Sequence, residues 1–267
     1  MRHAETFRRL HQNTSPLRLA NAWDAGSARL VEELGAQAVA TTSAGVAWAL
    51  GYPDGNRMPV AELARITANI VRTIRIPLSV DVENGYTDDA AGIEGNLRPI
   101  FAAGAVGINI EDGKAPPALL AAKIEQAKRT AATLGVDVFI NARTDVYLQS
   151  LVPEDRRQDE TIRRIKLYRN AGADGIFVPA LTAPGAIGAI VASTDLPLNL
   201  LAWPGLPDAA DLAKLGVRRL SAGSSIAAAA WQVVADLTND FLETGSSAGA
   251  LKNNMPYGRL QDLFQDR

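Results

Sequence analysis

The chain has 267 residues, of which 47% are hydrophobic and 21% are charged, and its formal net charge is -2. These values fit one large globular domain or two small ones, and the absence of a basic block argues against nucleic acid or an anionic membrane surface as a partner. The sequence has no apolar run of about 18 residues, and its first segment, MRHAETFRRLHQ, lacks a hydrophobic signal core, so we expect a cytoplasmic protein that does not span a membrane.

The residue types that are missing restrict the chemistry. The sequence contains no cysteine, which excludes disulfides, zinc-thiolate sites and thiol nucleophiles. The only two histidines, His3 and His11, lie in the polar N-terminal segment, which argues against a histidine base in a deep site. Catalysis would therefore rest on carboxylates, lysine, arginine, tyrosine, serine or threonine.

One unit recurs along the chain: a helical stretch, then a glycine, then a short apolar strand. Gly35, Gly104, Gly172 and Gly216 fit the left-handed residue that ends a helix before the chain turns into a strand. The predicted strands, in chain order, are 17–23, 38–43, 76–83, 106–112, 138–144, 175–180, 197–203 and 218–223. Eight strands alternating with helices are typical of a (β/α)8 TIM barrel, although an open parallel sheet has the same alternation. We predict the barrel, as a catalytic domain over residues 1–244.

Residues 245–267 follow the eighth predicted helix. They begin with GSSAGA, which has the composition of a flexible linker, and continue with NNMPYGRLQDLFQ, a short amphipathic helical segment. Two interpretations of this C-terminal arm stay open. It is either a terminal helix that caps its own barrel or an arm that packs on a neighbouring subunit.

Charged and polar residues gather where the predicted strands end. They are Asp81 and Glu83 on the third strand, Glu111 and Asp112 on the fourth, Arg143 on the fifth and Asn199 on the seventh. The active site of such a barrel lies at the carboxyl ends of its strands, and residues two apart on a strand share a face. Acids at one rim repel one another unless a cation holds them together, which predicts an oxygen-coordinated ion such as Mg2+ or Mn2+. The alternative is that these acids form ion pairs with Arg143 or cap the following helices.

Four motifs carry a resemblance to a known family. They are TTSAGVAWALGYPD (41–54), SVDVENGY (79–86), GINIEDG (107–113) and INARTD (140–145). Their order and spacing resemble the isocitrate lyase and phosphoenolpyruvate mutase superfamily, in particular its phosphoenolpyruvate phosphonomutase-like branch. The resemblance implies a barrel enzyme that binds Mg2+ and a small-molecule 2-oxo-carboxylate or its enolate. It also implies a homo-oligomer, a dimer or tetramer, in which subunits exchange the eighth helix.

The resemblance also implies roles for the residues around the metal. Asp81 corresponds to the metal-proximal carboxylate, and Glu83 and Glu111 to carboxylates that hold metal-bound waters. Asp54 corresponds to an acid that helps to organise the same water network beside the substrate. A cation at this position would polarise the 2-oxo group and stabilise an enolate.

Other residues are implied to bind the substrate or to act on it. The substrate-binding set is Thr42, Ser43, Ala44, Gly45, Asp54, Arg143 and Asn199, with Arg143 as the positive partner of the substrate carboxylate. Tyr86 would bring a hydroxyl to the rim, or would be only a half-buried packing ring. Arg143, Tyr86 and Lys114 are the candidate catalytic residues.

The sequence departs from the family pattern at two places. The family motif has aspartate at the position of Glu83, whose longer side chain reaches a metal through water. The loop after the fourth strand, EDGKAPPALLAAK, has neither the cysteine and histidine of the isocitrate and methylisocitrate lyases nor the Asn-Ser pair of the phosphonate mutases. Lys114 is the only ionisable side chain of this shortened loop, and it is a proton donor, an anchor for a second carboxylate, or a solvated lysine.

These observations predict a Mg2+-dependent lyase or decarboxylase. It would break a carbon-carbon bond next to a 2-oxo acid through an enolate held on the metal. Two alternatives remain: carbon-phosphorus chemistry of the phosphonopyruvate hydrolase or phosphoenolpyruvate mutase type, and a 2-oxo acid binding protein without turnover.

Overall fold

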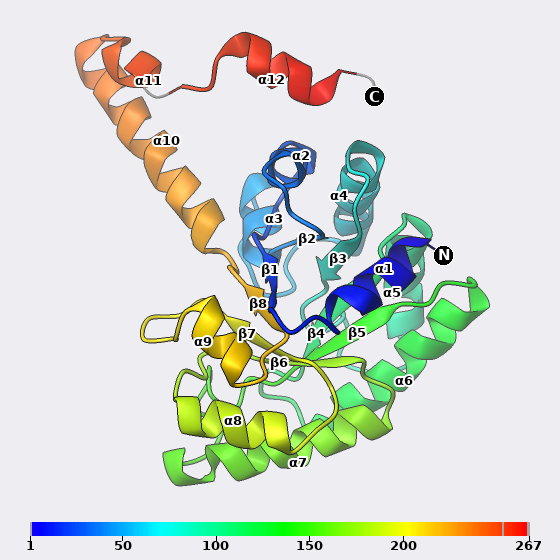
Figure 1. The fold of residues 1–267 in the computed structure, drawn as a ribbon. Helices are drawn as coiled ribbons and strands as arrows, with labels where there is room; N and C mark the ends of the chain where they lie inside the picture. The colour runs from blue at the N-terminus through cyan, green and yellow to red at the C-terminus, as the bar shows by residue number, and fades with distance from the viewer. Residues whose placement is uncertain (1, 253, 266–267) are drawn as a thin grey trace.

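The computed structural model describes residues 2–252 and 254–265, and eight parallel strands form its centre (Figure 1). The strands are β1 Leu17–Leu19, β2 Val39–Ala40, β3 Leu78–Asp81, β4 Gly107–Glu111, β5 Phe139–Arg143, β6 Gly175–Val178, β7 Leu198–Leu201 and β8 Arg219–Ser221. Each strand pairs with its neighbour in chain order, β1 pairs with β8, and a parallel bridge between Ala22 and Thr41 joins the remaining edges. The predicted (β/α)8 barrel is therefore confirmed, with strands shorter than the sequence patterns indicated.

Helices separate the strands and cover the outside of the barrel. They are α1 Arg2–Leu10, α2 Ala25–Glu33, α3 Ser43–Ala49, α4 Val60–Thr73, α5 Ile93–Ala102, α6 Pro117–Thr133, α7 Arg157–Asn170, α8 Pro184–Ala192, α9 Ala209–Lys214, α10 Ser225–Thr244, α11 Ala248–Lys252 and α12 Tyr257–Phe264, with a 3-10 turn, η1, at Glu154–Arg156. The glycines that were predicted to end helices do so with left-handed φ values: Gly35 92°, Gly104 108°, Gly172 100° and Gly216 88°. Glycine adopts this conformation without the steric cost that a Cβ atom adds.

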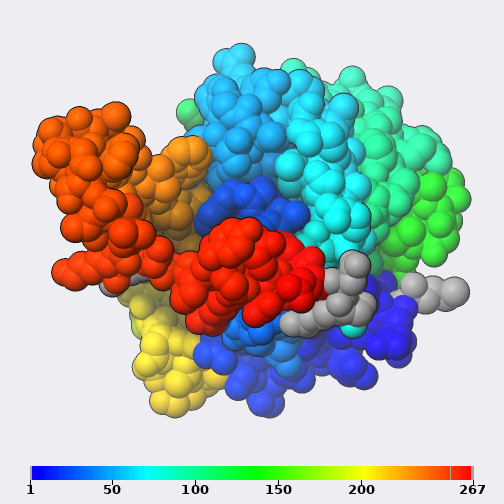
Figure 2. Space-filling view, turned by 90° about the horizontal axis from the view of Figure 1, so that it is seen from above, coloured from blue at the N-terminus to red at the C-terminus, as the bar shows by residue number. Residues whose placement is uncertain are grey.

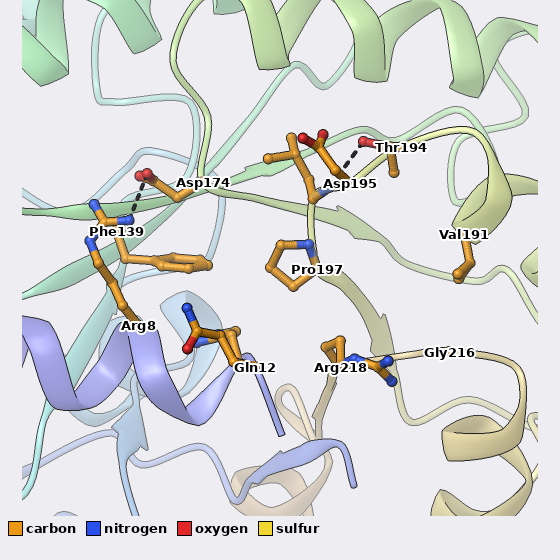
Figure 3. A pocket seen from close by; sticks show the side chains of 12 residues that line it. Arg8, Gln12, Phe139, Asp174, Val191, Thr194, Asp195, Pro197, Gly216 and Arg218 are labelled. Atoms are coloured by element: carbon orange, nitrogen blue, oxygen red, sulfur yellow. Dashed lines mark hydrogen bonds and ion pairs between the residues drawn. The ribbon is translucent and has the colours of Figure 1, made fainter. Parts of the chain in front are cut away.

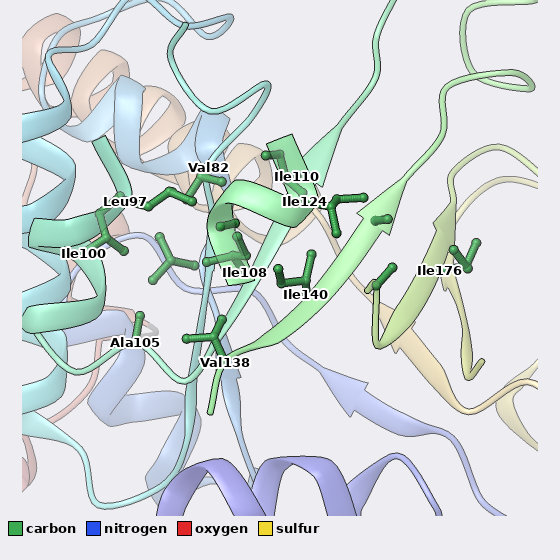
Figure 4. Close-up of a cluster of buried hydrophobic side chains, with 14 of the residues drawn as sticks. Val82, Leu97, Ile100, Ala105, Ile108, Ile110, Ile124, Val138, Ile140 and Ile176 are labelled. Carbon is green, nitrogen blue, oxygen red and sulfur yellow. The ribbon is translucent and has the colours of Figure 1, made fainter. Parts of the chain in front are cut away.

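The main apolar core lies between the strands and the surrounding helices (Figure 4). Ile108 and Ile110 of β4, Ile140 of β5 and Ile124 of α6 are fully buried in it. Burying such a side chain stabilises the fold by about 1.5–3 kcal/mol. The core fixes β3, β4 and β5, whose carboxyl ends carry the acids and the arginine identified in the sequence.

A helix that the sequence patterns did not indicate closes the base of the barrel. Phe7 of α1 is fully buried, and a Cβ atom on Gly107 would come within 2.6 Å of its ring, so only glycine leaves room for it. His11 is 4% exposed, stacks on Phe139 with 4.2 Å between ring centres and donates from Nδ1 to the Phe7 carbonyl (2.8 Å). The expectation of a polar N-terminal segment is therefore wrong for His11. Burial lowers the pKa of this histidine to about 3.

The C-terminal helices leave the barrel and then return to it (Figures 1 and 2). Most of α10 is exposed, whereas α12 packs on α2, where Arg29 Nε donates to the carbonyl of buried Leu263 (2.9 Å). Gly245 ends α10 with a φ of 65°. Among the described residues, no helix is both long and apolar enough to cross a membrane.

Candidate active site

Asp81 is the last residue of β3, and backbone groups from two strand ends fix its position. Its N–H donates to the Thr41 hydroxyl (2.8 Å), and its carboxylate accepts from the N–H of Glu83 (3.2 Å). The N–H of Ser43 bonds to the same carboxylate. Asp81 therefore offers a fixed carboxylate at the mouth of the barrel.

The chain leaves the extended conformation directly after β3. Glu83 has a left-handed φ of 50°, followed by Gly85 (89°) and Tyr86 (56°). The sequence argument that Asp81 and Glu83 share a strand face therefore does not apply, because only the first of them lies in a strand. A left-handed non-glycine residue costs about 1–2 kcal/mol, so two of them in one turn indicate a conformation that the surroundings impose.

Glu83 is buried, and both of its carboxylate oxygens accept hydrogen bonds. The Tyr86 hydroxyl donates to one oxygen (2.9 Å), and the backbone N–H of Asn56 donates to the other. Burial raises the pKa of Glu83, and the two hydrogen bonds oppose that shift. Burial and the adjacent Glu83 also raise the pKa of Tyr86, so this hydroxyl keeps its proton at neutral pH.

Arg143 ends β5 and lies between two carboxylates. Nη1 pairs with Glu111 of β4 (2.7 Å), and Nε pairs with Asp145 (2.7 Å), whose side chain is fully buried. Nη2 makes a second, longer bond to Asp145 (3.2 Å), and the guanidinium lies 5.9 Å from the centre of the Phe177 ring. A guanidinium has five N–H groups, so Arg143 keeps donors for a ligand while these contacts hold its orientation.

The carboxyl groups at the mouth destabilise one another's charges. Burial raises the pKa of Glu111 to about 8, against the attraction of Arg143 and with repulsion from Asp81 and Asp145. Burial likewise raises the pKa of Asp81, Arg143 lowers it, and the nearby Asp54 adds repulsion. A cation among these oxygens would favour their ionised forms.

The donor set fits Mg2+ or Mn2+ held largely through water. Asp81, Glu83 and Glu111 offer only oxygen atoms, the ligand type that both ions prefer. In the part of the chain that the structure describes, no three acidic or histidine side chains converge closely enough to bind one ion directly. Mg2+ keeps several of its own waters and commonly takes one or two carboxylates directly, so these residues fit such an ion without forming a complete cage of direct ligands.

The predicted cradle for the substrate carboxylate is the start of α3. Thr42 caps this helix, and its hydroxyl accepts the N–H of Gly45 (3.5 Å). A Cβ atom on Gly45 would lie 2.7 Å from Thr42 Cγ2 and 3.0 Å from Trp23 Cβ, so this turn requires glycine. The N–H of Ser43 already bonds to Asp81. The Ser43 hydroxyl and the N–H of Ala44 are therefore the cradle donors that could bind a substrate carboxylate.

The remaining predicted residues lie at different depths. Asp54 is exposed in the loop after α3 and acts on Asp81 and Glu83 through its charge. Asn199 is the second residue of β7 and is fully buried; its Oδ1 accepts from Ser221 (3.2 Å), and its Nδ2 has no partner among the described residues. Asn199 therefore brings free N–H groups to the interior of the barrel.

Lys114 borders a small polar cavity beside Glu111. The cavity has a volume of about 240 Å³, and its wall includes the side chains of Asn56, Asn84 and Lys123. A larger cavity of about 520 Å³ lies at the base of the barrel, between α1 and the starts of β5, β7 and β8 (Figure 3). None of the acids of the mouth lines that second cavity, whereas Glu111 lines the first together with Asp88 and Asp112, so we place the candidate site beside the first.

Sequence reasoning missed part of the site and misplaced one acid. Asp145, which orients Arg143, stands in the INARTD motif but received no role. Asp112 was counted among the acids at the rim; it borders the small cavity, yet its side chain is fully buried against α7, where it pairs with Arg164 (2.8 Å) and accepts from Tyr168 (2.6 Å). Adjacent residues of a strand point to opposite faces, so that alternation was the signal that could have separated Glu111 from Asp112.

Comparisons with known proteins agree with this geometry. A family model described as phosphoenolpyruvate phosphomutase matches residues 7–242. An uncharacterized protein of Mycobacterium tuberculosis is 35% identical over 98% of this chain and 96% of its own length. An oxaloacetate decarboxylase of Bradyrhizobium sp. is 32% identical over 87% of this chain and 82% of its own length. A solved structure from Burkholderia cenocepacia, a provisionally assigned phosphonomutase, is 40% identical, with a TM-score of 0.85 over 90% of this chain and 100% of that chain.

Proposed function

The chain belongs to the phosphoenolpyruvate phosphomutase family, and from that premise we propose that it is a Mg2+-dependent lyase that decarboxylates a small 2-oxo dicarboxylate. The observation that carries this proposal is the cavity of about 240 Å³ between Glu111 and Lys114. It has room for one small substituent beside Glu111, and Lys114 would provide the positive charge that a second carboxylate requires. The relatives named oxaloacetate decarboxylase support the same reaction class.

Different groups at the mouth would bind the metal ion and the substrate carboxylate. Asp81 would hold the ion directly, with Glu83 and Glu111 binding its waters, and a bound Mg2+ would supply polarisation of the 2-oxo group. The remaining N–H groups of Arg143 and the cradle donors at Ser43 and Ala44 would bind the carboxylate next to that group.

Decarboxylation then needs little further chemistry from the protein. The bond between the third carbon and its carboxylate breaks, carbon dioxide leaves, and the electron pair moves into the enolate of pyruvate. The third carbon later takes up one proton. Tyr86 keeps its proton at neutral pH and lies at the rim, so we propose Tyr86 as the donor and Lys114 as the group that positions the departing carboxylate.

Carbon-phosphorus chemistry is the competing function. It is suggested by the Burkholderia structure, but the cavity wall also includes Asp88 and Glu111, whose charges oppose a phosphoryl group more than a carboxylate. A protein that binds 2-oxo acids without turnover is the third possibility.

One screen separates these three functions. The protein would be incubated with Mg2+ and oxaloacetate, methyl-substituted oxaloacetates or phosphonopyruvate, and the products identified by NMR. We expect carbon dioxide and a 2-oxo monocarboxylate from the first group, and loss of turnover in Lys114→Met. Inorganic phosphate from phosphonopyruvate would establish the competing function, and saturable binding without product would refute an enzymatic role.

The exposed face of α10 supports a proposed assembly. Its exposed large apolar residues are Ile226, Trp231, Val233, Val234, Leu237, Phe241 and Leu242. Several recur at intervals of three or four positions, and an apolar stripe of this kind marks a protein interface. We propose that a second copy covers this stripe by exchanging α10, that the oligomer is a dimer or tetramer, and that residues 245–267 form an arm appended to the catalytic barrel of residues 1–244.

A further inference from the structure

Lys123 is a buried cation to which the proposed chemistry gives no role. It lies on α6, is 3% exposed, and donates from Nζ to the backbone carbonyls of Asn84 (2.8 Å) and Thr87 (2.5 Å). None of the ion pairs among the described residues includes Lys123; Asp88 and Asp89 act on it only through their charges. A buried ammonium group costs free energy to desolvate, so its placement on two carbonyls calls for a reason.

The two carbonyls bracket the left-handed turn that carries Tyr86. A second side chain, Asn96 of α5, donates from Nδ2 to the carbonyls of Gly85 (2.9 Å) and Tyr86 (3.1 Å). Four consecutive carbonyls, from residue 84 to residue 87, therefore accept hydrogen bonds from side chains of two neighbouring helices. This turn also places the Tyr86 hydroxyl on Glu83, so the two helices determine where both groups lie.

We propose that Lys123 is a positioning residue for the reaction. It acts together with Asn96, by holding the turn at 84–87 so that Tyr86 and Glu83 keep their place at the mouth. Lys123 and Asn84 also line the cavity beside Glu111, so the same contacts shape the wall against which the substrate would lie. This inference rests on the proposed decarboxylase function.

The matched variants are Lys123→Met and Lys128→Met. Lys128 lies on the same helix, one and a half turns further on, and its Nζ binds the Val138 carbonyl (2.9 Å) and pairs with Asp174 at the base of the barrel. Removing either ammonium group should lower stability. Only Lys123→Met should lower kcat for the 2-oxo dicarboxylate, by at least about tenfold with little change in KM, because misplacing a reacting group by about 1 Å costs up to about a hundredfold in rate.

A double-mutant cycle tests the route through Tyr86. If Lys123 acts by positioning that hydroxyl, Lys123→Met should cost less than about threefold when Tyr86→Phe is already present, because the two effects are then not additive. Full additivity would refute the proposal, and so would equal losses of kcat in Lys123→Met and Lys128→Met.

Hydrogen exchange separates this inference from the proposed function. Backbone amides of residues 83–87 should exchange faster in Lys123→Met than in the parent protein or in Lys128→Met, whatever the substrate is. If the parent protein turns over no 2-oxo acid, the decarboxylase proposal fails, and positioning is decided by Mn2+-dependent oxalate binding, which Lys123→Met should weaken. Unchanged exchange, or faster exchange with unchanged kcat and oxalate binding, would overturn the positioning role.

Discussion

Neutralising Asp81 is the most direct test of the proposed metal site. Asp81→Asn removes one charge at nearly constant shape, and the backbone N–H groups of Glu83 and Ser43 can still donate to the amide oxygen. Because burial raises the pKa of Asp81, the charged carboxylate is less favourable in the metal-free folded state than in the unfolded state, and we expect the neutral variant to be at least as stable as the parent without metal. Its affinity for Mn2+ should nevertheless fall at least tenfold, or about 1.4 kcal/mol.

Oxalate makes this loss measurable, because it mimics the planar pyruvate enolate. At a hundredfold excess over its dissociation constant, oxalate with Mn2+ should stabilise the parent by about 2.7 kcal/mol, and a tenfold weaker complex at the same concentration by about 1.4 kcal/mol. For a domain of this size these values correspond to rises in Tm of about 5–10 °C and about 3–5 °C.

The assay is a thermal melt with and without chelator, supported by isothermal titration of Mn2+ and oxalate. Asp89→Asn is the control, because Asp89 accepts the Gly92 N–H (2.7 Å) outside the site and should leave binding unchanged. If Asp81→Asn binds Mn2+ and oxalate like the parent, or if it unfolds, the role of Asp81 as the direct ligand is refuted.

Three further outcomes follow from the same geometry. Burial raises the pKa of Glu111 from 4.5 to about 8, so between these pH values the folded state holds a proton that the unfolded state has released, and the unfolding free energy of the metal-free protein should fall as pH rises through that window. Urea titrations measure this slope, which saturating Mg2+ should flatten. A metal-free stability that rises with pH would contradict this account. Isocitrate and methylisocitrate should not be cleaved, because the loop after β4 has no thiol acid; turnover at ordinary enzymatic rates, about 1–1000 per second, would show that another acid replaces it. Sedimentation should find a dimer or tetramer at micromolar concentration, and Trp231→Glu with Leu237→Glu should yield monomers; a monomeric parent protein would refute the exchanged α10.

The barrel could be predicted because its signals are local. A glycine after a helix and an apolar run after that glycine recur along the chain, at Gly35, Gly104, Gly172 and Gly216, and parallel strands need such helical connections. The acids at the strand ends could be predicted for the same reason, since the topology brings all carboxyl ends of the strands to one face. Asp81 and Glu111 lie at that face as the pattern indicated.

Some contacts that orient these groups could not be predicted, because they join segments distant in sequence: the N–H of Asn56 reaches Glu83 across 27 positions. Asp145 is only two positions from Arg143, but it lies beyond the end of β5, where strand alternation no longer indicates the direction of a side chain. His11 shows another limit: it was assigned to a polar N-terminal segment, and it is buried directly after the amphipathic helix α1, at the base of the barrel.

The groups that would hold the metal and the groups that would select the substrate belong to different elements. The turn after β3 is fixed by Asn96 of α5 and Lys123 of α6, whereas Lys114 lies in the exposed loop between β4 and α6. A change in that loop therefore alters the cavity without disturbing the carboxylates, because no described hydrogen bond connects Lys114 to them. For this chain, the loop with a single lysine and no thiol is the feature that favours a departing carboxylate over a larger leaving group that must be protonated.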